Sequence, residues 1–125
     1  MSMNPSRRGS IRTAAARQTP PRLSKRRLES MVEEATIDAY GEAEQAGGFF
    51  TMIEEHLRIP FYTTVLGVEV TVTKIDMTNA DEIVVVCQHG KEKQRIPILE
   101  LPLPSPPPVG AEWIEAYRHW QRGGQ

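Results

Sequence analysis

The stretch DAYGEAEQAGGFFTMIEEHLRIPF, residues 38–61, combines an apolar stripe with a row of carboxylates. Its apolar residues recur at steps of three or four positions, which predicts an amphipathic helix over residues 41–57. The predicted buried stripe consists of Ala43, Ala46, Gly47, Phe50, Ile53 and Leu57. Pro60 ends this helix, because the residue before a proline is pushed to extended geometry.

Two adjacent glycines, Gly47 and Gly48, lie in the middle of the predicted helix. Each weakens a helix by roughly 1 kcal/mol relative to alanine. A glycine pair at this place predicts either a kink or the close approach of another backbone.

The middle of the chain predicts short antiparallel strands separated by polar turns. The strands are expected at residues 61–67, 68–77, 82–89 and 94–99. In the second of them a period of two places one set of residues on a single face: Val68, Val70, Val72 and Lys74. A small, strongly bent sheet avoids open edges by closing, so we expect a partly open SH3-like barrel.

The chain ends with a proline-rich strap and a final helix. Residues 101–110 hold five prolines, which predicts a stiff, polyproline-like segment that is either a rigid connector or a ligand of the PxxP kind. The helix that follows is expected to bury one face, made by Trp113, Ile114, Tyr117 and Trp120 or Gln121. The predicted fold is therefore α+β, with an N-terminal amphipathic helix and a C-terminal helix packed on an SH3-like antiparallel barrel.

Charge divides the chain into two parts. Residues 1–27 hold eight of the 15 basic residues and no acid, which leaves residues 28–125 with 7 basic and 16 acidic residues, a net charge of −9. We predict a disordered basic tail over residues 1–30 and one acidic domain over residues 31–125. The tail is either an unstructured extension or an arm for nucleic acid or another anionic surface. The acidic domain itself repels phosphate backbones, so nucleic-acid binding by it is not expected.

Several classes of protein are disfavoured by what the sequence lacks. No apolar run is long enough to span a membrane, and no apolar segment follows the basic N-terminus as in a secretory signal. Cys87 is the single cysteine, so no internal disulfide can form, and we expect a cytoplasmic protein. Common nucleotide-binding, hydrolase and metalloprotease motifs are absent, and the three histidines lie far apart, so no enzymatic activity is predicted.

The carboxylates are the strongest functional signal. Residues 29–55 contain eight acidic residues and no lysine or arginine, whereas a solvated helix usually mixes charges of both signs. Asp38 and Glu42 are four positions apart and face the same way on a helix that starts early. Carboxylate oxygens suit Ca²⁺ or Mg²⁺, although the chain has no EF-hand loop. Composition alone favours the simpler explanation, in which the carboxylates are solvated and Glu42 and Glu44 interact with the helix dipole.

This segment resembles the opening of the small CcbP-type calcium-binding proteins of cyanobacteria. The resemblance rests on an acidic D-x-Y-x-E-x-E-Q run, an aromatic helix ending in E-[ED]-x-L, and a closing P-F. The matching residues are Asp38, Tyr40, Glu42, Glu44, Gln45, Phe49, Phe50, Glu54, Glu55, Leu57, Pro60 and Phe61. It extends more weakly through GVEVTVTKID and WIEAYRHWQRGG, so that it covers about residues 35–123. It implies a non-EF-hand calcium-binding module with a buffering or signalling role.

Two departures from the family pattern imply fewer or weaker sites. The acidic insertion between the central strands is reduced to MTNADE, with Asp76, Asp81 and Glu82 as its remnants, and Gly41 stands where an acidic residue can occur. We predict Ca²⁺ ligation by Asp38, Glu42 and Glu55, with Glu44 and Glu54 in support. The alternative is a protein-interaction module in which the barrel, the strap and the tail hold an unknown protein partner. Neither prediction involves a membrane.

Overall fold

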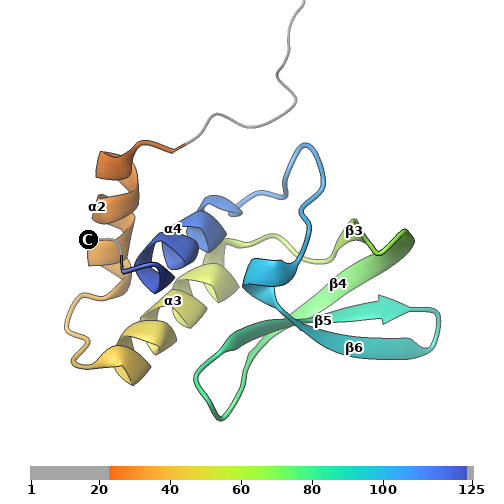
Figure 1. Cartoon of the computed structure of the whole chain (residues 1–125), viewed down its shortest axis with the longest axis horizontal. Helices are drawn as coiled ribbons and strands as arrows, with labels where there is room; N and C mark the ends of the chain where they lie inside the picture. The colour runs from red at the N-terminus through yellow and green to blue at the C-terminus, as the bar shows by residue number, and fades with distance from the viewer. Residues whose placement is uncertain (1–22, 124–125) are drawn as a thin grey trace, which may run out of the picture.

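The computed structural model describes residues 23–123, which form three α-helices and one four-stranded antiparallel sheet (Figure 1). The helices are α2 (Lys25–Ala35), α3 (Glu42–His56) and α4 (Glu112–Gln121). The strands are β3 (Phe61–Val65), β4 (Val68–Met77), β5 (Ile83–His89) and β6 (Glu92–Pro97), followed by the short 3₁₀ helix η2 (Ile98–Glu100). The helices gather at one end and the sheet extends away from them, which confirms the predicted α+β class.

The sheet is open rather than closed into a barrel. Its strand order is β3-β4-β5-β6, so each strand pairs with its neighbour in sequence and β3 and β6 form the two edges. The predicted SH3-like barrel is therefore not confirmed. The chain that leaves η2 is rich in prolines, which cannot donate ladder hydrogen bonds, so no fifth strand follows to link the edges.

A bulge in β4 changes which residues face the core. The pairing register between β4 and β5 shifts between Val72 and Lys74. Val70 and Val72 are buried as predicted, but the extra residue places Ile75 in the core and leaves Lys74 exposed. The prediction that Lys74 shares the buried face is wrong, because a strict period of two cannot be carried across a bulge.

Helix α3 has the predicted bounds, with Gly41 as its N-cap and Leu57 as its C-cap. Its buried aromatic residue is Phe49, which is 0% exposed, whereas the predicted Phe50 is only partly buried. The Phe49 ring packs against Tyr117 and Trp120 of α4, at centroid distances of 5.6 and 5.3 Å. The predicted residues Ala46, Ile53 and Leu57 are buried, whereas Phe49 takes the place of Phe50 and Ala43 is exposed.

Helix α2 spans the domain boundary that was expected at residue 30. It starts at Lys25, where the Ser24 Oγ accepts a hydrogen bond from the Arg27 backbone N–H at 3.0 Å. Met31 is 0% exposed, and Leu28 and Val32 pack against the core. The boundary predicted at residue 30 therefore falls inside a packed helix. The rest of the predicted tail, residues 1–22, lies outside the described residues.

Close backbone contacts hold the helices together. A Cβ on Gly48 would lie 2.0 Å from the Ala35 carbonyl oxygen, so α2 crosses α3 where only a glycine fits. The glycine pair was predicted to allow such an approach, and Gly48 confirms it. The end of the strap meets the other end of α3, because a Cβ on Gly110 would lie 2.0 Å from the His56 carbonyl oxygen.

Helix α4 closes the core over α2 and α3. Trp113, Ile114 and Tyr117 are buried, as predicted. Trp120 is partly buried and donates its indole N–H to the Gln45 side-chain oxygen at 3.0 Å, while Gln121 is exposed. Within residues 23–123 no helix is long and apolar enough to cross a membrane.

Candidate functional site

The predicted calcium ligands occupy the two ends of α3. Asp38 and Glu42 lie at its N-terminal end together with Glu44, and all three are exposed. Glu54 and Glu55 lie in its last turn and are also exposed. A helix rises 1.5 Å per residue, so the two groups are about 15 Å apart along the axis. The five residues therefore cannot surround a single ion.

The N-terminal group lies around the loop that joins α2 to α3. Asp38 has a φ of 61°, a left-handed conformation that aspartate tolerates better than most residues. Gly41, with a φ of 89°, ends the loop, and Glu42 is the first helical residue. Neither the Asp38 nor the Glu42 carboxylate has a hydrogen bond or ion pair with residues 23–123.

Glu44 has a structural role of its own. Its Oε1 accepts a hydrogen bond from the Tyr40 backbone N–H at 2.8 Å. The N-cap residue Gly41 has no side chain to offer, so Glu44 reaches back over the helix start, much as the glutamate of a capping box does. This bond accounts for the position of the Glu44 carboxylate without a bound cation.

The C-terminal group lies where the helix dipole is negative. Glu54 and Glu55 make no ion pair among the described residues, and the helix terminus disfavours their charge. The next residue, His56, stacks on Trp113 with a centroid distance of 5.5 Å and an interplanar angle of 19°. This end of α3 therefore attracts cations, because no basic side chain among the described residues neutralises Glu54 and Glu55.

No three carboxylate, histidine or cysteine side chains within residues 23–123 converge in the manner of a metal site. The remnant acid Asp76 is engaged elsewhere: it forms an ion pair with Arg95 and accepts a hydrogen bond from the Met77 N–H at 2.8 Å. The Met77 bond, followed by the bond and charge of Arg95, lowers the Asp76 pKa despite some desolvation. Any cation held by α3 must complete its shell with backbone carbonyls and water.

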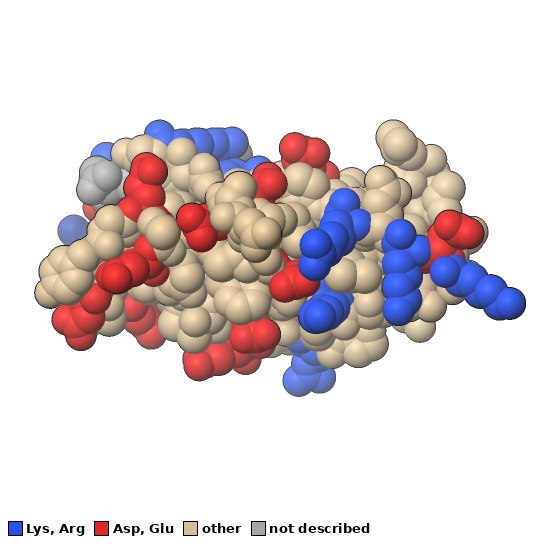
Figure 2. Space-filling model, turned by 90° about the horizontal axis from the view of Figure 1, so that it is seen from below, with Lys and Arg blue, Asp and Glu red and all other residues tan. Residues whose placement is uncertain are grey.

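Charge is distributed unevenly over the surface. Figure 2 shows acidic side chains over much of the helical half of one face, and Lys and Arg side chains over the sheet half and along one edge of the helical half. The basic side chains on the sheet come from Lys74, Lys91, Lys93 and Arg95, all exposed. The helical half thus offers a cation the more favourable potential.

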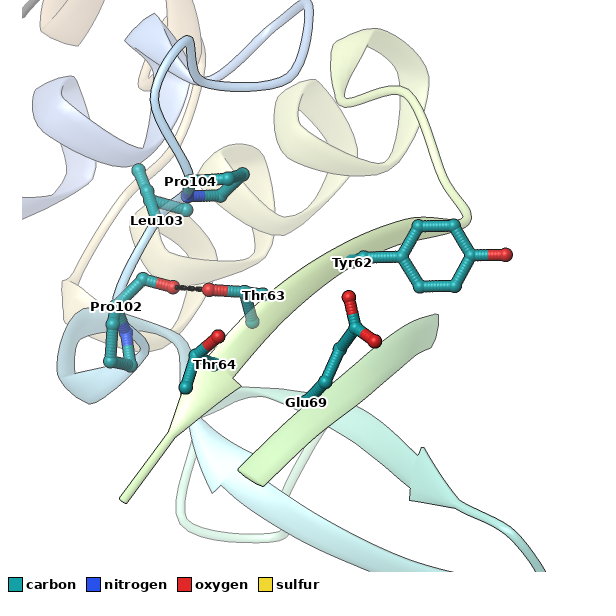
Figure 3. Close-up of a pocket in the computed structure, with 7 residues that line it drawn as sticks. All are labelled: Tyr62, Thr63, Thr64, Glu69, Pro102, Leu103 and Pro104. Atoms are coloured by element: carbon teal, nitrogen blue, oxygen red, sulfur yellow. Dashed lines mark hydrogen bonds between the residues drawn. The ribbon is translucent and has the colours of Figure 1, made fainter. Parts of the chain in front are cut away.

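Two hollows on the sheet are not predicted by the sequence analysis. One, of about 350 Å³, lies beside β3 and is lined by Tyr62, Thr63, Thr64, Glu69, Pro102, Leu103 and Pro104 (Figure 3). The other, of about 290 Å³, lies at the far end of the sheet and includes Leu66, Val68 and His89. The alternation of Tyr62 and Thr64 with buried residues is a signal that could have identified the exposed face of β3.

No protein-family model matches the chain, and no curated protein matches it. A solved structure described as "Calcium binding protein in the calcium-binding form" superimposes on it with a TM-score of 0.60 and 18% sequence identity. The match covers 83% of this chain and 99% of that chain. The two proteins therefore share a fold over nearly the whole length of the solved one.

Proposed function

We propose that this chain is a non-enzymatic calcium-binding domain of the CcbP type, which buffers Ca²⁺ or signals its concentration. The observation that carries the proposal is the fold shared with a protein solved in its calcium-binding form. The eight acidic residues between positions 29 and 55, with no lysine or arginine among them, support it independently. Ca²⁺ accepts six to eight oxygen ligands in flexible geometry, which suits exposed carboxylates better than the strict octahedron of Mg²⁺ does.

The proposed primary site is the N-terminal end of α3. Asp38 and Glu42 supply two carboxylates without partners among the described residues, and the loop before the helix supplies backbone carbonyls. The positive end of the helix dipole opposes a cation here, so affinity is expected to be modest, about 10⁻⁵–10⁻⁴ M. Glu54 and Glu55 form a separate point of attraction at the other end, where only two adjacent carboxylates are available.

An NMR titration of the full-length, ¹⁵N-labelled chain with Ca²⁺ tests both the function and the site. We expect saturable amide shifts centred on residues 36–44, and weaker shifts with Mg²⁺ at the same concentration. The double variant Asp38→Asn/Glu42→Gln should lose them, whereas Glu54→Gln/Glu55→Gln should keep them. The control Glu92→Gln/Glu112→Gln removes the same charge far from the loop and should titrate as the wild type does. Absence of localised shifts in millimolar Ca²⁺ would refute the proposal.

One observation favours the alternative, a protein-interaction module. The sheet ends in exposed apolar side chains: Leu66 is 98% exposed, and Val68 is also exposed beside it. Together with the hollow nearby, these residues form an apolar surface of the kind that marks interaction sites. Under this alternative the calcium titration leaves all amides unmoved.

A further inference from the structure

The hollow beside β3 has two walls of different chemistry. Tyr62 and Glu69 project from the exposed face of the β3–β4 pair, and Leu103 and Pro104 lie on the strap opposite (Figure 3). The Thr63 hydroxyl donates to the Pro102 carbonyl oxygen at 2.5 Å, which fixes the strap to the strand edge. The hollow is thus part of the folded domain rather than a gap between independent segments.

Two polar side chains of this hollow, Tyr62 and Glu69, have no partners in the described domain. Tyr62 is 65% exposed, and neither its hydroxyl nor the exposed Glu69 carboxylate has a hydrogen bond or ion pair with residues 23–123. Tyr62 pairs with Thr71, which makes Glu69 its diagonal neighbour on the same face, about 7–8 Å away. A guanidinium can stack on such a ring and pair with such a carboxylate, while its methylene stem lies on the prolines.

We propose that the chain's own N-terminal segment, residues 1–22, docks in this hollow through Arg7 or Arg8. The segment carries five arginines and no acid, whereas residues 28–125 have a net charge of −9. Opposite charge therefore draws the segment to the domain, and the hollow offers an arginine side chain a ring, a carboxylate and an apolar wall together.

The length of the segment fits the reach that is needed. The described structure starts at Leu23, and an extended chain spans about 3.3–3.6 Å per residue, so Arg8 can lie about 50 Å from Leu23. A domain of 100 residues has a radius of gyration of about 13 Å, so Arg7 and Arg8 can reach any point on its surface. Arg17 and Arg22 are limited to about 20 Å or less.

Tethering makes a weak site effective. One ring and one carboxylate bind a free basic peptide weakly, but the covalent link to Leu23 raises the effective concentration of the segment to about the millimolar range. The chain's own segment therefore occupies the hollow ahead of a dilute partner. The docked segment needs no Ca²⁺, so this inference stands or falls separately from the proposed function.

Paramagnetic relaxation enhancement on the full-length chain in calcium-free buffer tests the inference. A nitroxide is attached to Ser6→Cys; the native Cys87 is 3% exposed and does not compete for the label. We expect the amides of Thr64, Glu69 and Leu103 to broaden most. Glu69→Gln and Arg7→Gln/Arg8→Gln should reduce this broadening to the average of the domain. Arg17→Gln/Arg22→Gln removes the same charge and should leave it unchanged.

Three outcomes would overturn the inference. Broadening centred on the acidic residues of α3 would mean that the segment follows the general field and not the hollow. Equal loss in both double-arginine variants would mean that net charge alone matters. The third outcome concerns a second copy of the chain. A nitroxide-labelled chain without ¹⁵N could broaden the amides of a ¹⁵N-enriched chain that carries no nitroxide, and the broadening in a sample carrying both labels could fade on dilution. Together these results would assign the hollow to a second copy.

Discussion

The contact between α2 and α3 gives a sharp prediction, because two neighbouring glycines differ in what surrounds them. A Cβ on Gly48 would lie 2.0 Å from the Ala35 carbonyl oxygen, whereas a Cβ on Gly47 would meet nothing within 4 Å. Real Cβ atoms essentially never approach another atom within 3.0 Å, so Gly48→Ala must push the two backbones at least 1.0 Å apart. Backbone cannot yield as a side-chain tip does, so α2 must shift as a unit.

The size of the effect follows from two opposing terms. Alanine in place of glycine favours a helix by about 0.5–1 kcal/mol. Gly47→Ala should show that gain undiminished, which raises the melting temperature by several degrees for a domain of this size. Overpacking costs about 1–3 kcal/mol, so Gly48→Ala should be neutral to destabilised by about 2 kcal/mol. The two variants should therefore differ by about 1–3 kcal/mol.

Urea denaturation followed by far-ultraviolet circular dichroism measures both variants under the same conditions. Gly47→Ala is the matched control, since it makes the same chemical change one position away. Equal stabilisation by the two substitutions would refute the reasoning, because it would mean that α2 does not lie against Gly48. In that case the helix before residue 36 would not belong to the packed domain.

Three further predictions concern the core and the sheet. Trp113→Ala should destabilise the domain by about 3–5 kcal/mol in urea denaturation, because the buried indole also stacks on His56; a cost below about 1 kcal/mol would place the ring outside the core. Burial raises the pKa of the Cys87 thiol, so the native protein should react slowly with a thiol reagent at pH 8 and quickly in urea; fast native reaction would show that β5 opens. The Met77 N–H and then Arg95 hold the pKa of Asp76 below its ordinary value, so this carboxylate stabilises the fold above the ordinary pKa and loses its contribution as the pH falls through the folded pKa. Arg95→Ala should raise the Asp76 pKa in a carboxyl NMR titration, and no change would mean that the ion pair is not formed in solution.

Elements with strong local signals could be predicted from the sequence. Gly41 and Pro60 mark the two ends of helix α3, and the alternation of β4 and the apolar run of β5 predict the positions of these strands. Helix α2 is not predicted by the sequence analysis, because its first turn is basic and continues the charge of residues 1–22. The signal was nevertheless present: Leu28, Met31, Val32 and Ala35 follow helical spacing and form its inner face.

The remaining errors come from tertiary effects that a single sequence does not reveal. The sequence pattern does not distinguish Phe49 from its neighbour Phe50 as the buried aromatic residue, because the choice depends on where α4 lies. The bulge that displaces Lys74 leaves no mark in the pattern of β4. The five candidate ligands looked like one cluster because they are close in sequence, but a rigid helix separates Glu44 from Glu54 by about 15 Å.

The central claim is that Ca²⁺ binds at the start of α3, and isothermal titration of the full-length chain tests it most directly. Wild type should bind with a dissociation constant of about 10⁻⁵–10⁻⁴ M, and a hundredfold excess of free Ca²⁺ over that constant should stabilise the fold by about 2.7 kcal/mol. Asp38→Asn keeps the shape and removes one charge, so it should bind more weakly while Glu92→Gln binds as wild type does. Absence of heat and of thermal stabilisation in millimolar Ca²⁺ would contradict the claim, and equal binding by Asp38→Asn would contradict the placement of the site.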